Sequence, residues 1–269
     1  MNTATDIAPA PARAPWGPDC ALASVLAIAG ALATAALLPY MLDTMPAMFA
    51  RVQVPMPVLL LAQSAQAVVA VGVLALLGLR MAPRAGLALP WLTALLARRP
   101  LPAVPWALAV LSGLGAGALV MCASLLVDPH LPAPLHAHAA APAAASAWHG
   151  FLASFYGGIV EEVELRLFVM TLLVWLLAKV LGKPPTAGLY WFAILGAALV
   201  FGAGHLPAAA QVWPLDAIVV ARVLLLNAVA GVVFGWLYWK RGLEVAMLAH
   251  FSADLVLHVV APLVAPGSA

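Results

Sequence analysis

Four ionisable side chains lie close together in the otherwise apolar segment 148–178. Glu161, Glu162, Glu164 and Arg166 supply three carboxylates and one guanidinium. Glu162 and Arg166 are four residues apart with the acid first, which is the favourable order for an ion pair on one face of a helix. A single guanidinium cannot neutralise three acids. At least one carboxylate is therefore available for chemistry, and a general base is the role that a sheltered carboxylate could fill.

Two later apolar segments carry imidazoles. His205 follows Phe201 by four residues, and two intervening glycines allow another backbone to come close. His250, Asp254 and His258 are spaced by four residues and share one face of a helix. Taken alone, each group could be a packing or hydrogen-bonding feature. Together they indicate a site, because nearly all the acids and imidazoles of the apolar segments fall in three of them.

The composition indicates a membrane protein. The chain has 269 residues, of which 65% are hydrophobic and 8% are charged, with a mean hydropathy of +1.07. A soluble domain carries about a quarter charged residues. The net charge of +2 does not indicate a nucleic-acid partner, because the few cations fall in short loops. Cys20 and Cys122 lie in or beside apolar runs, so neither a disulfide framework nor a cysteine metal site is expected.

Seven apolar segments are long enough to cross a bilayer, which takes about 20 residues. The expected spans are 21–42, 57–79, 104–127, 148–178, 189–205, 215–239 and 243–264. The apolar piece 87–96 is too short to cross and is expected in the membrane interface. The predicted fold is an all-α, polytopic membrane helix bundle of about seven transmembrane helices. Since a charge at mid-bilayer costs about 2.5–3.5 kcal/mol, the neighbouring helices must shelter the acids of the fourth span.

The distribution of cations predicts the orientation. With the N-terminus inside, nine Lys and Arg residues lie in inner segments, and only Arg51 lies in an outer one. This asymmetry fits the positive-inside rule and predicts an N-in, C-out topology. The excess of Arg over Lys and the Ala content are typical of a GC-rich bacterial genome. The expected location is therefore a bacterial inner membrane.

The chain divides into four parts in this interpretation. They are a disordered tail over 1–19, three accessory spans with loops over 20–147, four core spans over 148–264 and a short tail over 265–269. Residues 128–147 form an Ala/Pro/His loop that carries His130, His136 and His138. We interpret this loop as a low-complexity linker in preference to a metal site.

Three motifs in this order resemble the CPBP family of intramembrane proteases, which includes the CAAX-prenyl endopeptidase and abortive-infection-like bacterial proteins. The motifs are E-E-x-x-x-R (Glu161, Glu162, Arg166), F-x-x-x-H (Phe201, His205) and H-x-x-x-D (His250, Asp254). The likeness covers about residues 148–260. It implies an endopeptidase that hydrolyses a peptide bond within the membrane or at its edge.

The resemblance also implies roles. Glu161 would take a proton from the attacking water, which His205 would help to hold. Glu162 and Arg166 would fix the helix and its charge. One Glu and two His could also hold a catalytic zinc, but the chain lacks H-E-x-x-H. A metal-free glutamate mechanism without a cofactor is the preferred expectation, and zinc is the alternative.

His250 and Asp254 match the pair that stabilises the tetrahedral oxyanion in the family. Relatives often have Asn at the second position, and an ionised Asp cannot donate a hydrogen bond. Asp254 is therefore expected to orient His250 and favour its charged form, which leaves His250 as the donor. Glu164 and His258 are not motif positions.

Straight spans do not bring these groups to one depth. Glu161 would lie about 20 Å from the outer end of its helix, with His250 nearer the inner side and His205 nearer the outer. A shared site then requires the fifth helix to begin later than residue 189 or to tilt strongly.

Two other classes of function compete with the protease. One is a proton-coupled transporter or channel with Glu161, Glu164, His250 and His258 as a relay. Internal repeats would favour it, and we find none between the two halves of the chain. The other is a non-catalytic immunity or scaffold protein of the same fold. The expected partners are membrane lipid and a membrane-anchored protein or peptide substrate, with no nucleic acid.

Overall fold

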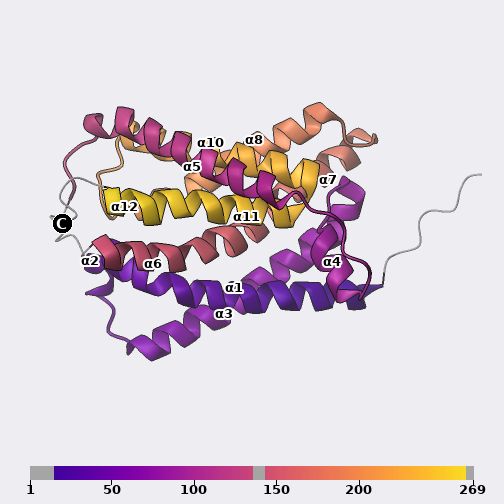
Figure 1. Ribbon diagram of the computed structural model, residues 1–269, viewed down its shortest axis with the longest axis horizontal. Coiled ribbons are helices and arrows are strands. Elements are labelled where there is room, and N and C mark those ends of the chain that lie inside the picture. The colour runs from indigo at the N-terminus through magenta and orange to yellow at the C-terminus, as the bar shows by residue number, and fades with distance from the viewer. Residues whose placement is uncertain (1–14, 136–142, 265–269) are drawn as a thin grey trace, which may run out of the picture.

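The protein is a bundle of long helices whose axes lie roughly along one line, with some helices running in opposite directions (Figure 1). A computed structural model describes residues 15–135 and 143–264. The long helices are α1 (Trp16–Thr44), α3 (Met56–Met81), α5 (Trp106–Val127), α8 (Ala187–Gly204), α10 (Ala217–Arg241) and α11 (Leu243–Asp254). Short helical elements connect them: α2 (Pro46–Phe49), η1 (Ala82–Ala85), α4 (Pro90–Leu96), η2 (Asp128–His130) and α9 (Leu206–Ala209). The described ranges contain no strand, which confirms the predicted all-α class.

The fourth predicted span is a continuous helix with two π-helical segments. It consists of α6 (Ala143–Tyr156), η3 (Gly157–Glu161), η4 (Val163–Met170) and α7 (Thr171–Leu181). The last span likewise continues from α11 through the π-helical η5 (Leu255–Val260) into α12 (Ala261–Val264). Six helices of the described chain are long and apolar enough to cross a membrane. The polytopic helical bundle is thus confirmed, while the total of seven spans and the N-in, C-out orientation stay predictions.

The ends of the predicted segments differ in detail from the helices. Helix α1 begins at Trp16, so the expectation of disorder is wrong for residues 16–19. The fourth-span helix begins at Ala143, inside the stretch assigned to the loop 128–147. The rest of the N-terminal tail, together with His136, His138 and the tail 265–269, lies outside the described residues.

Glycines allow the helices around the site to pack closely. A Cβ atom added to Gly113 of α5 would lie 2.0 Å from the backbone oxygen of Ala249 on α11. On α10, a Cβ at Gly231 would meet Ala198 of α8 at 3.0 Å, and one at Gly235 would meet Ile194 at 3.1 Å. Small residues are the usual means by which membrane helices approach. Gly231 and Gly235 thus allow α10 to pack closely against α8.

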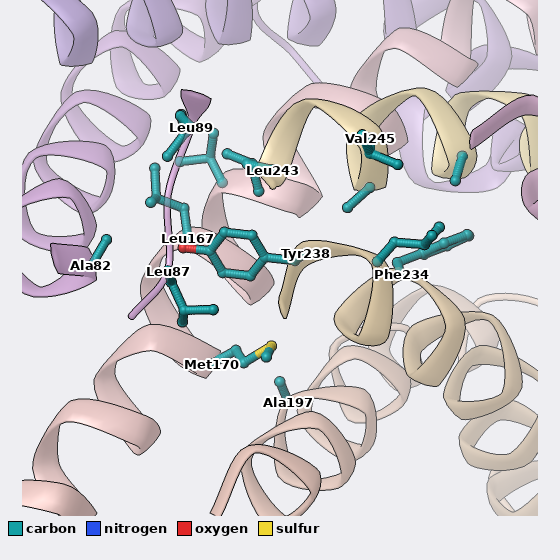
Figure 2. Packing of buried hydrophobic residues seen from close by; sticks show 14 of the residues in the cluster. Ala82, Leu87, Leu89, Leu167, Met170, Ala197, Phe234, Tyr238, Leu243 and Val245 are labelled. Carbon is teal, nitrogen blue, oxygen red and sulfur yellow. The ribbon is translucent and has the colours of Figure 1, made fainter. Parts of the chain in front are cut away.

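One end of the bundle is closed by the segment 82–97. Leu87 and Leu89 are buried against Tyr238 and Leu243 (Figure 2). The backbone N–H of Leu243 donates to the oxygen of Ala88 at 3.2 Å. The first part of the piece predicted to lie in the interface is thus buried inside the protein, where it covers the start of α11.

The helices that carry the acids and imidazoles are offset along their axes. Gly196 of α8 contacts Leu173 of α7, and the two helices run in opposite directions (Figure 1). Nine residues further along the chain, His205 at the end of α8 therefore reaches the level of Glu161. A later start of this helix is wrong, because α8 begins at Ala187. The offset of the α7–α8 pair produces the common depth.

Candidate active site

The paired acids lie at the junction of two π-helical segments. Glu161 ends η3, and Glu162 separates η3 from η4. π-Helical turns are rare and occur frequently at functional sites. The side chains of these two neighbours reach different partners: Glu161 lies beside two imidazoles, whereas Glu162 lies between a guanidinium and one of those imidazoles.

Glu162 and Arg166 form a buried ion pair, as their spacing predicts. The distance from Arg166 Nη1 to Glu162 Oε1 is 3.0 Å, and the two side chains are 1% and 0% exposed. Arg166 Nη2 also donates to the backbone oxygen of Gly231 at 3.1 Å. The guanidinium lies 5.0 Å from the ring centre of Phe201 and 5.3 Å from that of Phe234. Helices α8 and α10 thus surround the charge with apolar rings and one carbonyl oxygen.

Glu162 also holds His250. The distance from His250 Nδ1 to Glu162 Oε1 is 2.8 Å. A carboxylate can only accept, so Nδ1 carries the proton of this hydrogen bond. Phe234 stacks on the imidazole with a centroid distance of 4.4 Å and an interplanar angle of 21°. Nε2 then faces Glu161 Oε2 at 3.5 Å and Asp254 Oδ1 at 3.7 Å.

This arrangement corrects the expectation that Asp254 orients His250. The hydrogen bond to the imidazole comes from Glu162, while Asp254 lies beyond hydrogen-bond distance on the opposite nitrogen. Glu162 therefore does more than balance Arg166. Gly157 leaves the space that Asp254 occupies, since a Cβ at this position would lie 2.2 Å from Asp254 Oδ2.

His205 presents its ring to Glu161 in the same way. It caps the end of α8, and its Nδ1 donates to the backbone oxygen of Phe201 at 2.9 Å. Its Nε2 lies 3.7 Å from Glu161 Oε1. Both imidazoles are thus held through Nδ1 and direct Nε2 at Glu161, one toward each carboxylate oxygen. Both separations exceed a hydrogen bond, so neither ring fully occupies the carboxylate.

The Glu161 carboxylate is accessible although it lies inside the bundle. Its side chain is 18% exposed and that of His205 is 37% exposed, against 4% for His250. A partly exposed carboxylate with two imidazole nitrogens beside it can exchange a proton with a small polar molecule and orient it.

All six residues predicted for the site belong to one connected cluster. They are Glu161, Glu162, Arg166, His205, His250 and Asp254. Glu164 is half-buried and takes part in none of these contacts. Sequence reasoning missed three contributors, namely Gly157, Phe234 and the backbone oxygen of Gly231. Two of them had a visible signal: Gly157 is the first of two glycines before the acids, and Gly231 is spaced by four residues from Gly235.

The zinc alternative would take its ligands from Glu161, His205 and His250. Among the residues that the structure describes, no group of three His, Cys, Asp or Glu side chains has the arrangement needed to hold an ion. Both imidazoles direct Nε2 at the carboxylate itself. We therefore derive no step through zinc.

The fold and this cluster define a class: a polytopic, all-helical membrane protein with a sheltered carboxylate and two imidazoles supplied by three helices. Residues 142–256 match the family model described as Rce1-like, type II CAAX prenyl endopeptidase Rce1-like. The matched region contains all six cluster residues and confirms the resemblance to the CPBP family. Neither a curated protein nor a solved structure gives a significant match to the chain.

Proposed function

We propose that the protein is an intramembrane endopeptidase that hydrolyses a peptide bond in a membrane-anchored protein or peptide by a metal-free glutamate mechanism. One observation carries the proposal. The carboxylate of Glu161 lies 3.7 Å from His205 Nε2 and 3.5 Å from His250 Nε2, and these groups come from three separate helices.

The reaction begins at Glu161. Its carboxylate takes a proton from a water molecule that His205 orients, and the water oxygen attacks the scissile carbonyl carbon. The tetrahedral intermediate carries a negative oxygen, to which protonated His250 donates through Nε2. Glu161 then returns its proton to the leaving amine as the C–N bond breaks. The water is consumed, and no proton is gained or lost by the site.

Glu162 and Arg166 prepare His250 for this role. Because Glu162 accepts from Nδ1 at 2.8 Å, the ring is fixed with Nε2 toward the reaction centre. Arg166 balances the charge of Glu162 by direct contact at 3.0 Å. Asp254, an acid where many relatives have an amide, supports the proton on His250 Nε2 from 3.7 Å rather than donating to the oxyanion.

The sequence supports a bacterial inner membrane as the location, with the N-terminus inside. The substrate class is a protein or peptide held at the membrane. Glu161 lies within the helix bundle, so a substrate has to approach it from the membrane. Prenylated proteins are substrates of the kind that the family description names. A bacterial membrane peptide is the substrate class that we propose for this chain.

The decisive experiment compares peptides released from membranes by the wild type and by Glu161→Gln, at matched expression and thermal stability. Glu164→Gln is the matched control, because it removes a nearby acid that lies outside the cluster. We expect the release to be lost in Glu161→Gln, His205→Ala and His250→Ala and kept in Glu164→Gln.

Retained cleavage in any of the first three variants would defeat the mechanism. Proton flux in liposomes without peptide release would assign a transporter, and a wild-type phenotype of the Glu161→Gln strain would assign a scaffold. Loss of activity on chelation, with recovery on added zinc alone, would overturn the metal-free reaction.

A further inference from the structure

A tyrosine from the first helix contacts the last span beside the site. The hydroxyl of Tyr40 on α1 lies 3.1 Å from His258 Nδ1 in η5. The two rings meet edge-on, with centroids 5.1 Å apart and planes at 65°. Neither residue lies in the region 142–256 that matches the family. An accessory helix therefore reaches a residue one turn from the proposed catalytic groups.

His258 shares Asp254 with His250. His258 Nε2 lies 3.9 Å from Asp254 Oδ1, and the same oxygen lies 3.7 Å from His250 Nε2. Exposure of the side chains falls along this row, from 32% for His258 to 12% for Asp254 and 4% for His250. One carboxylate oxygen thus faces two imidazoles, one partly open and one buried.

The local backbone is shaped to permit these contacts. Gly150 of α6 lets this helix lie against η5, since a Cβ at Gly150 would be 2.0 Å from the backbone oxygen of His258. The π-helical turns of η5 begin directly after Asp254. The close packing of α6 and the contact from α1 hold His258 from two sides.

We propose that Tyr40 and His258 are positioning residues that keep Asp254 ionised and directed at His250. The inference rests on the proposed function, which it deepens. The hydroxyl of Tyr40 donates to His258 Nδ1, so the ring proton of His258 sits on Nε2, facing Asp254. Asp254 then interacts with an N–H from each imidazole. Between these two N–H groups, Asp254 stabilises the protonated form of His250, which donates to the oxyanion.

Other ionisable groups near His258 do not replace this role. Asp254 is the acid on its own helix, and Tyr40 is the group supplied by α1. Asp43 and His149 also join α1 to α6, but they pair with each other at 2.5 Å.

The test uses the full chain in liposomes with a cleavable membrane peptide. We expect Tyr40→Phe and His258→Gln each to lower kcat by about tenfold with KM unchanged, because each removes one partner of the hydrogen bond between Tyr40 and His258. In an Asp254→Asn background the same two substitutions are expected to lose this effect, because a neutral amide has no charge to support. His149→Gln is the matched control, since it removes a polar contact of α1 with α6 that does not involve His258 or Asp254.

Two kinetic outcomes would overturn the proposal. An equal fall in kcat for His149→Gln would mean that Tyr40 only fastens α1 to the bundle. A full tenfold effect in the Asp254→Asn background would mean that His258 does not act through Asp254.

A second readout separates this proposal from the proposed function. Solid-state NMR of ¹⁵N-labelled histidine in the same liposomes reports the protonated nitrogen, and His258→Gln assigns the signal. We expect the Nε2–H form of His258 in the wild type and its loss in Tyr40→Phe. An Nδ1–H form in the wild type would refute the inference even if cleavage occurs, whereas absence of Glu161-dependent cleavage would refute the proposed function alone.

Discussion

Glu162 has two roles, since it pairs with Arg166 and accepts a hydrogen bond from His250. The roles can be separated by removing the charge of Glu162 alone and then the charges of Glu162 and Arg166 together. In Glu162→Met, Arg166 stays fully buried with no carboxylate 3.0 Å away. Breaking a buried ion pair in this way costs about 3–5 kcal/mol of stability. In the double variant Glu162→Met/Arg166→Met, both charges are gone and the volume is kept. Such replacements are often neutral or stabilising.

Cleavage activity, unlike stability, is expected to be low in both the single and the double variant. The 2.8 Å hydrogen bond from His250 Nδ1 is lost in both variants. A hydrogen bond to a charged group is worth about 1.5–3 kcal/mol, which corresponds to a loss of roughly 10- to 150-fold in kcat/KM. The double variant should therefore recover thermal stability without recovering cleavage.

The assay pairs thermal unfolding in detergent with cleavage of a membrane-anchored peptide at matched protein levels. Arg166→Met alone completes the cycle, because it leaves Glu162 buried without its cation. Recovery of activity together with stability in the double variant would refute the reasoning. It would mean that Glu162 only neutralises Arg166 and that the bond to His250 contributes nothing to the reaction.

Three further substitutions test packing and the shape of the site. Gly113→Ala places a Cβ atom 2.0 Å from a backbone oxygen of α11 and should lower the stability measured by thermal unfolding by about 1–3 kcal/mol. Gly115→Ala is the control, because open space surrounds Gly115 and its stability should not change. Gly157→Ala places a Cβ atom 2.2 Å from a carboxylate oxygen of Asp254 and should impair cleavage while changing thermal stability less. A loss of stability large enough to account for the loss of cleavage would contradict this. Tyr190→Phe removes a hydroxyl that donates to a backbone oxygen of the segment 82–97 at 2.7 Å, so it should cost about 1 kcal/mol of stability and leave cleavage unchanged.

Local patterns were enough to predict the helices and the contacts within each helix. Helix α3 lies within two residues of its predicted bounds, because about 20 apolar residues between polar ends leave few alternatives. The pair Glu162 and Arg166 followed from helix periodicity, as did the row of His250 and Asp254. These predictions depend only on residues within one turn of each other.

Contacts between helices could not be predicted in the same way. The bond between Glu162 and His250 joins residues 88 positions apart and depends on how the two helices are rotated. The π-helical turns on both sides of Glu162 change that rotation, and no residue type specifies them. The position of His205 along the bundle axis depends on how far α8 is shifted relative to α7. Hydropathy does not predict this shift. Side-chain partners across helices therefore had to come from the structure.

The charges of the site give a reason for having an acid at position 254. Glu161, Glu162 and Asp254 supply three carboxylates, and Arg166 supplies one fixed cation. Neutrality of the buried cluster with all three acids ionised requires two further positive charges, and the cluster offers imidazoles to carry them. With an amide in place of Asp254, one imidazolium would suffice. An acid at position 254 therefore favours one more protonated imidazole than an amide would, and His250 faces both Glu161 and Asp254.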